Sequence, residues 1–169
     1  LLMNGGFSPL RGFMGKAAYE SVVDKLRLPD GALWSIPVTL DVPDDMASGL
    51  GAGRRLALRD SEGFMLAVLT VEDVWQPDKL REAQEVYGTT TTDHPGVRYL
   101  LEQTHGTYVG GTVEGIQLPI QLDFETLRDT PEDLRHLFVK MGWQNVVGFH
   151  TCKPMHRLHR AITLQAARE

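Results

Sequence analysis

Cysteine is almost absent from this chain, since only Cys152 among its 169 residues carries a thiol. One cysteine excludes an internal disulfide framework and favours a reducing compartment, so we expect a cytoplasmic location. No uninterrupted apolar run approaches the roughly 20 residues needed to cross a bilayer, and no signal peptide is visible at the N-terminal end. The sequence therefore predicts a protein that is not anchored in a membrane.

An excess of basic residues is also missing. Lys and Arg total 17 against 22 Asp and Glu, which gives a net charge of −5. Without a basic cluster, the chain lacks the electrostatic footprint of a nucleic-acid-binding protein. The negative balance still allows an anionic substrate, because binding depends on the local field at the site. A Gly-x-x-x-x-Gly-Lys-[Ser/Thr] loop is absent too, so these residues cannot form a P-loop phosphate site.

Short strands and interspersed helices without an internal repeat characterise roughly the first 120 residues, which indicates a compact, mixed β-rich unit. Two glycines in its last strand, Gly110 and Gly111, predict close approach by another backbone. The sequence predicts helices over 16–26, 77–86 and 96–103, and strands over 33–42, 54–59, 64–74 and 108–113.

A helix–strand–turn–helix order, typical of α/β folds, follows toward the C-terminal end. Residues 130–133 (TPED) predict a capped helix start, and Gly142 predicts its end. The apolar run in 143–149 predicts a strand covered on both faces, with a second helix from Met155. One strand cannot form a parallel sheet, so we expect this chain to be a piece of a longer protein, with the partner strands beyond Glu169.

The turn between that strand and the last helix is the best candidate site. His156 and His159 are three residues apart, so both should project from one face of the first helical turn. Thr151, Lys153 and the free N–H groups of a helix N-terminus suit an anion, and open α/β sheets bind nucleotides at such places. We therefore predict a triphosphate site. The alternative is an exposed helix start without special chemistry, because two-residue motifs are common by chance.

Two other interpretations use the same turn. His150, Cys152, His156 and His159 could form a His₃Cys set of zinc ligands. Their spacing matches no common zinc finger and Pro154 divides them, so a phosphate-facing site is favoured. Cys152 could also be a reactive thiol, because it precedes Lys153 and a helix N-terminus. An inert cysteine is the simpler interpretation.

Segments spread along the chain match one enzyme family. They are LLMNGGFSPL at 1–10, GALWSIPVTLDV at 31–42, HPG at 94–96, TPEDLR at 130–135 and PMHRLH at 154–159. With these segments the chain resembles the ATP sulfurylase (sulfate adenylyltransferase) family, in the fungal and related bacterial form that can be fused to adenylylsulfate kinase. The resemblance implies an α+β to α/β fold, with a PUA-like β-rich domain over 1–122 and the beginning of a Rossmann-like nucleotidyltransferase domain over 123–169.

The resemblance also implies the chemistry. Sulfate attacks the α-phosphorus of MgATP, pyrophosphate leaves, and adenylyl sulfate forms without a covalent enzyme intermediate. Mg²⁺ arrives with ATP and no protein-bound metal is implied; the partners are ATP, sulfate or adenylyl sulfate, further copies in a homo-oligomer, and a fused adenylylsulfate kinase domain. The residues implied are His156 and His159 as catalytic groups, with His150, Thr151, Cys152, Lys153 and Arg157 at ATP- and sulfate-binding positions.

This sequence departs from the family motif at the predicted site. The usual Gln-Thr-Arg-Asn is His150-Thr151-Cys152-Lys153 here, so a thiol replaces the planar fork of a guanidinium. Losing one preorganised donor of this kind costs about 3–4 kcal/mol in the transition state, or roughly a hundred- to a thousandfold in rate. We therefore predict weak or absent sulfate adenylation. The alternative is a catalytically silent scaffold or oligomerisation domain of a fused adenylylsulfate kinase.

Overall fold

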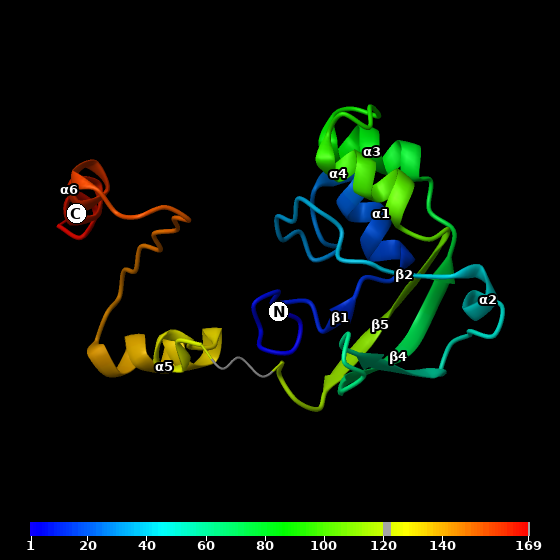
Figure 1. Cartoon of the computed structure of the whole chain (residues 1–169), viewed down its shortest axis with the longest axis horizontal. Coiled ribbons are helices and arrows are strands. Elements are labelled where there is room, and N and C mark those ends of the chain that lie inside the picture. Colours follow the sequence, from blue (N-terminus) through cyan, green and yellow to red (C-terminus); the bar gives the residue numbers. More distant parts are fainter. Residues whose placement is uncertain (120–122, 169) are drawn as a thin grey trace. The chain divides into compact units, whose positions relative to one another are not determined.

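The computed structural model describes residues 1–119 and 123–168, and the chain divides into two compact units, Leu1–Arg128 and Asp129–Glu169. The first unit contains an antiparallel sheet of five strands in the described residues, with helices packed against it (Figure 1). Its elements are β1 (Gly12–Phe13), α1 (Lys16–Lys25), β2 (Leu40–Val42), α2 (Asp44–Ala47), β3 (Arg55–Arg59), β4 (Met65–Trp75), α3 (Lys79–Tyr87), α4 (Pro95–Arg98), the π-helix η1 (Tyr99–Gln103), β5 (Thr107–Gly115) and the 3-10 helix η2 (Glu125–Leu127).

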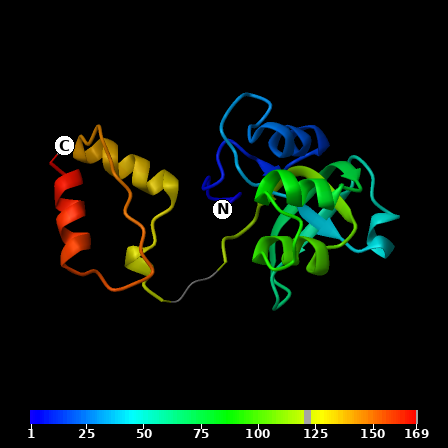
Figure 2. The ribbon, with the colours of Figure 1, turned by 90° about the horizontal axis from the view of Figure 1, so that it is seen from above.

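Strand β5 is the centre of this sheet. It pairs with β4 on one side, and on the other with both β1 and β2. Neighbouring residues of a strand face opposite sides of a sheet. Tyr108 of β5 therefore belongs to a core cluster on one side, with Tyr19 and Trp75, whereas Val109 belongs to a second cluster with Leu69. Helices α1, α3 and α4 are grouped together over the first cluster (Figures 1 and 2).

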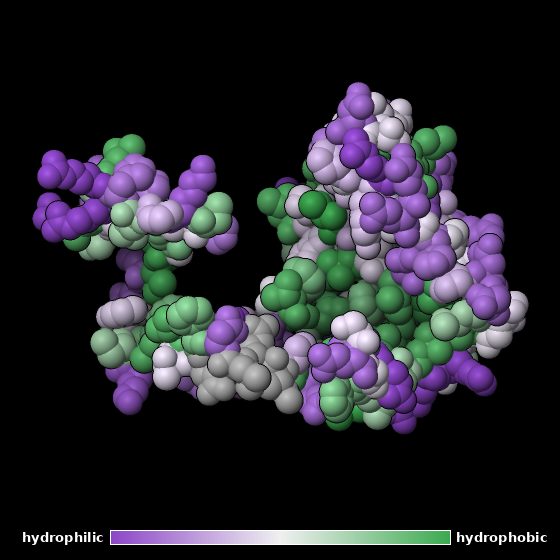
Figure 3. Space-filling model, in the orientation of Figure 1, coloured by the Kyte–Doolittle hydropathy of each residue, from purple (hydrophilic) through white to green (hydrophobic). Residues whose placement is uncertain are grey.

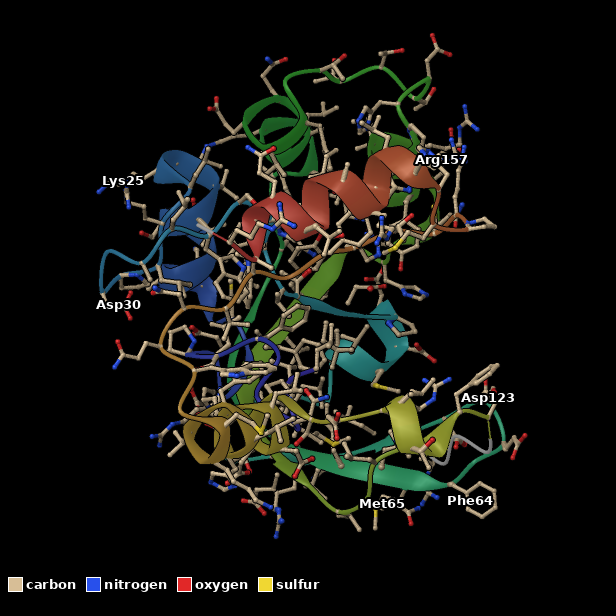
Figure 4. All side chains as sticks on the ribbon, turned by 90° about the vertical axis from the view of Figure 1, so that its left-hand side faces the viewer. Lys25, Asp30, Phe64, Met65, Asp123 and Arg157 are labelled. Atoms are coloured by element: carbon tan, nitrogen blue, oxygen red, sulfur yellow. The ribbon has the colours of Figure 1, made fainter. Side chains whose placement is uncertain are left out.

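The hairpin formed by β3 and β4 confirms the prediction for 54–59 and 64–74. Asp60 holds its turn, because Oδ1 accepts hydrogen bonds from the backbone N–H groups of Glu62 (3.0 Å) and Phe64 (2.9 Å). Gly63 adopts a φ of 92°, which an L side chain would resist. Phe64 lies at the hairpin tip beside Met65 and points away from the sheet (Figure 4).

The predicted strand over 33–42 is largely wrong. Only Leu40–Val42 pairs with β5, and Leu33 makes a single isolated bridge with Arg27. Pro37 has no N–H to donate to a ladder, and the Trp34 indole N–H donates to the Ile36 carbonyl (2.8 Å). Residues 33–39 therefore form an irregular segment, which lines a cavity of this unit.

The glycines of β5 confirm the predicted close approach of two backbones. A Cβ on Gly110 would lie 2.6 Å from Gly15 Cα and would also overlap the carbonyl oxygen of Met14. Neither contact involves a side chain that could move away. Glycine at this position is therefore required for the segment after β1 to pack against the central strand.

The second unit begins with a helix whose local signals were all readable from the sequence. Helix α5 (Pro131–Met141) has Thr130 as its N-cap and Gly142, with φ 69°, at its C-terminal end. The Thr130 side chain accepts the Asp133 N–H (3.2 Å), while Asp133 Oδ2 accepts the Thr130 N–H (3.0 Å). This reciprocal capping box satisfies two donors that a helix N-terminus otherwise leaves unpaired, and it confirms the predicted start and end.

Replacing Thr130 with Ala should destabilise α5 locally by about 1 kcal/mol, because its N-terminal donors lose their acceptor. The amides of α5 should then exchange with deuterium about fivefold faster, as followed by mass spectrometry of the intact protein. Thr90→Ala is the matched control, since Thr90 is exposed and makes no side-chain hydrogen bond with a described residue. Unchanged exchange in α5 would show that the box does not stabilise the helix.

The predicted strand over 143–149 is wrong within this chain. The segment has no regular secondary structure, is exposed along its length and forms no strand pair with the described residues. A strand exists only where its N–H and C=O groups find a partner strand, and none is present in the described part of the chain. Helix α6 (Arg157–Ala166) follows it. Within the described residues, every helix is too short or too polar to cross a bilayer.

Candidate functional site

The turn before α6 is organised by one hydroxyl group. Thr151 Oγ1 accepts the backbone N–H of Lys153 and donates to the carbonyl oxygen of the same residue, both at 3.1 Å. Such side-chain-to-backbone bonds stabilise a local turn in place of regular structure. The hydroxyl therefore shapes the turn that leads to Pro154. Sulfate and phosphate oxygens accept hydrogen bonds, so the predicted contact would require the hydroxyl to donate to the anion instead of to the Lys153 carbonyl oxygen.

The N-terminus of α6 lies slightly later than expected. His156 is the N-cap, with an extended backbone (φ −117°, ψ 179°) and no side-chain capping bond, so the helix starts at Arg157 rather than Met155. The first backbone bond runs from Arg160 N–H to the His156 carbonyl (3.0 Å). The N–H groups of the three residues before Arg160 therefore have no acceptor within the helix. This end of α6, marked by Arg157 in Figure 4, offers N–H donors and the positive end of a helix dipole.

The two predicted catalytic histidines lie against each other. The imidazole rings of His156 and His159 are stacked, with their centroids 3.8 Å apart and their planes at 27°. The two rings therefore lie together as predicted, but only His159 belongs to the first helical turn, because His156 is the N-cap. The His159 ring also contacts the Phe149 ring, with the two centroids 5.7 Å apart. Phe149 was not predicted as a site residue; its only signal was an aromatic ring at the end of an apolar run.

His159 carries an unsatisfied polar atom. The residue is half-buried, and its Nδ1 is covered without a hydrogen-bond partner among the described residues. A covered ring nitrogen with no partner is costly and usually has a functional or structural explanation. A ligand would reach Nδ1 only if the groups that cover it moved, and a hydrogen bond there would fix the tautomer of the ring.

The remaining predicted residues lie along the exposed turn. His150, Thr151, Cys152, Lys153 and Arg157 are all exposed to solvent, and Cys152 is a free thiol. Apart from the stacked histidines, the structure does not bring these side chains into contact with one another. Their roles in binding ATP or sulfate stay predictions.

The alternative metal set is not assembled in this structure. Among the described residues, no three His, Cys, Asp or Glu side chains lie close enough together to hold a metal ion. His150 and Cys152 lie on the turn, whereas His156 and His159 belong to the helix start. What the turn does combine is backbone N–H donors, two imidazoles and the cations of Lys153 and Arg157. This donor set fits an anion with several oxygens.

The chain is similar to known proteins along almost its whole length. A model of the PUA-like domain matches residues 1–118, and a model of ATP-sulfurylase matches residues 125–169. A sulfate adenylyltransferase from Kluyveromyces lactis is 49% identical over 99% of this chain and 33% of its own length. A sulfate adenylyltransferase from Saccharomyces cerevisiae is 46% identical over 100% of this chain and 33% of its own length. The chain thus spans about one third of these relatives.

A solved structure shares the fold. The hexameric APS kinase from Thiobacillus denitrificans superposes with a TM-score of 0.71 and 36% identity, over 99% of this chain and 29% of that one. The predicted fold class, a PUA-like unit followed by the beginning of a nucleotidyltransferase domain, is therefore confirmed. Sequence identity along the whole chain, together with the two family models, establishes that the chain belongs to the ATP sulfurylase family.

Proposed function

We propose that the protein is a sulfate adenylyltransferase-type nucleotidyltransferase of sulfate activation, which forms adenylyl sulfate and pyrophosphate from ATP and sulfate. The observation that carries the proposal is the identity of 46–50% to sulfate adenylyltransferases over nearly the whole chain. The stacked imidazoles at the N-terminus of α6 support it, because they lie among donors suited to phosphate oxygens.

The reaction needs positioning more than acid–base chemistry. A sulfate oxygen forms a bond to the α-phosphorus of ATP, while the bond from that phosphorus to the bridging oxygen breaks and its electron pair leaves with pyrophosphate. Sulfate is already ionised, so no proton has to be removed from the nucleophile. The groups of this chain would act by orienting the phosphates and by neutralising their charge. Mg²⁺ would enter with ATP rather than in a site made by the protein.

In this protein we expect the adenylyl-transfer step to be slow. Cys152 takes the position where the family has an arginine, and its exposed thiol cannot form two parallel hydrogen bonds to an oxyanion. Lys153 supplies a positive charge one residue later. An ammonium group is a point charge without the fork geometry, and so it replaces the lost contact only in part.

A second candidate function is that of a scaffold or oligomerisation domain for an adenylylsulfate kinase in the same protein. The observation that favours it is the likeness to a hexameric APS kinase, 29% of which this chain covers. In that case the turn at 150–153 would no longer bind a nucleotide, and the changes at His150, Cys152 and Lys153 would not impair the protein's function. The parent protein would then contain a Walker-type phosphate loop outside these 169 residues.

Pyrophosphate release by the intact protein, with MgATP and with or without sulfate, tests the proposal. We expect a sulfate-dependent rate about a hundred- to a thousandfold below that of the Saccharomyces cerevisiae relative under the same conditions, as follows from losing one charged donor. An equal rate would contradict the role given to Cys152. A complete lack of sulfate dependence in a folded protein would reject adenylyl transfer and favour the scaffold function.

A further inference from the structure

A cavity in the first unit has no part in the chemistry proposed above. It has a volume of about 670 Å³, within the usual range for sites of small molecules. The space-filling view shows hydrophobic residues gathered in a hollow on this face of the unit (Figure 3). Five aromatic side chains from five separate segments line the cavity: Phe7, Trp34, Tyr87, Tyr99 and Tyr108.

One carboxyl group lines the same cavity. Glu82 of α3 is only 5% exposed, and the hydroxyl groups of Tyr19 (2.9 Å) and Tyr108 (3.2 Å) both donate to its Oε2. Its other oxygen, Oε1, accepts no hydrogen bond from any described residue. Burial raises the pKa of Glu82, and the two hydroxyl groups oppose that rise. The cavity thus contains a deeply buried acid with one free acceptor atom.

No cation contacts this carboxyl group directly. Within the described residues, no Lys, Arg or His side chain forms an ion pair with Glu82. The charge of Lys79 on the same helix acts on Glu82 and lowers its pKa, but the Lys79 ammonium group donates to the Thr104 carbonyl oxygen (2.8 Å) and forms no ion pair with the carboxyl group. A buried carboxylate is costly unless a partner compensates its charge. The structure therefore leaves a place for one positively charged group beside Oε1.

The aromatic lining favours the same kind of ligand. The faces of Trp and Tyr rings attract ammonium groups, and their area covers apolar carbon atoms. Tyr99 is 58% exposed and lies at the rim, whereas Tyr108 is 1% exposed and lies at the base with Glu82. A ligand could place its charged end at the base and its apolar end against the rim. Acid and aromatic rings together select against anions such as ATP or sulfate.

We propose that this cavity binds an organic ammonium ion with an attached aromatic or apolar group, its ammonium end at Glu82 Oε1 and its apolar end between Trp34 and Tyr99. The site uses residues of the first unit only. It is therefore independent of the turn at 150–159 and of the rate of adenylyl transfer.

The proposal is tested by calorimetric titration of the intact protein with 2-phenylethylamine. The neutral 2-phenylethanol and the anionic phenylacetate serve as probes of the same shape. We expect the amine to bind at least about tenfold more tightly than the alcohol, since only the amine can pair with the carboxylate, and phenylacetate not to bind. Equal affinities for amine and alcohol, or no binding of the amine at millimolar concentration, would overturn the proposal.

Three variants locate the site. Glu82→Gln keeps the size of the side chain and should abolish the advantage of the amine over the alcohol. Tyr99→Ala changes a side chain at the rim, so it should fold, and it should weaken both probes severalfold. Phe64→Ala removes an equally exposed aromatic ring outside the cavity and should change neither affinity. If Glu82→Gln does not fold, unchanged amine binding by Tyr99→Ala would still refute the proposal.

Discussion

The triple change Cys152→Arg, Lys153→Asn and His150→Gln should raise the sulfate-dependent rate of pyrophosphate release about a hundred- to a thousandfold. The three side chains are exposed on the turn before α6, so the change should leave the fold intact. The new guanidinium would give the phosphate or sulfate oxygens two parallel, charge-assisted hydrogen bonds. Steady-state rates at saturating MgATP, with sulfate varied, measure the effect.

Partial variants separate the contributions to that result. Cys152→Ser retains a short side chain without positive charge and should leave the rate unchanged. Lys153→Asn with His150→Gln, without the arginine, should also fail to raise it. A triple variant that melts at the same temperature as the parent and remains inactive would show that the block lies outside this turn. The scaffold function would then become the better proposal.

Gly110→Ala should lower the free energy of unfolding of the first unit by about 3 kcal/mol, at the upper end of the range for overpacked sites. The added methyl group would lie 2.6 Å from Gly15 Cα and 2.7 Å from Gly15 N. Both are backbone atoms of the N-cap residue of α1, which lies between that helix and the paired strand β1, so they cannot shift independently. The melting temperature should fall by roughly 10 °C.

Gly51→Ala is the matched control. A Cβ at Gly51 would meet no atom within 4 Å, so this variant should keep the melting temperature of the parent or raise it slightly. If Gly110→Ala lowered the free energy of unfolding by less than about 1 kcal/mol, the segment around Gly15 would be able to move away from β5 at little cost. The close approach of the two backbones would then have little importance for stability.

Local chemistry explains which parts of the fold the sequence predicts well. The hairpin at Asp60 and the capping box at Thr130 each depend on contacts between residues only a few positions apart. The closeness of His156 and His159 is equally local, since the two residues are three positions apart at the start of α6. These features were predicted correctly because no distant residue has to be known.

Features that depend on distant residues were predicted wrongly or missed. The run at 143–149 has the composition of a strand, but it has no partner among the described residues. Residues 33–39 were expected to continue a strand and instead line the cavity. The sequence did not indicate Glu82 as a site residue, because the tyrosines that donate to it lie 63 positions before it and 26 after it. The pattern of a single sequence does not show which distant residues come into contact.

The central position of β5 determines the order in which the strand pairs can form during translation. Of the four strand pairs in the described sheet, three include β5, and only the β3–β4 hairpin can form without it. A ribosome therefore has to release residues 107–115 before β1 and β2 gain any partner in this sheet. Until then β1 and β2 have no strand partner and are open to chaperones, so translation speed around residue 107 should influence the yield of native protein.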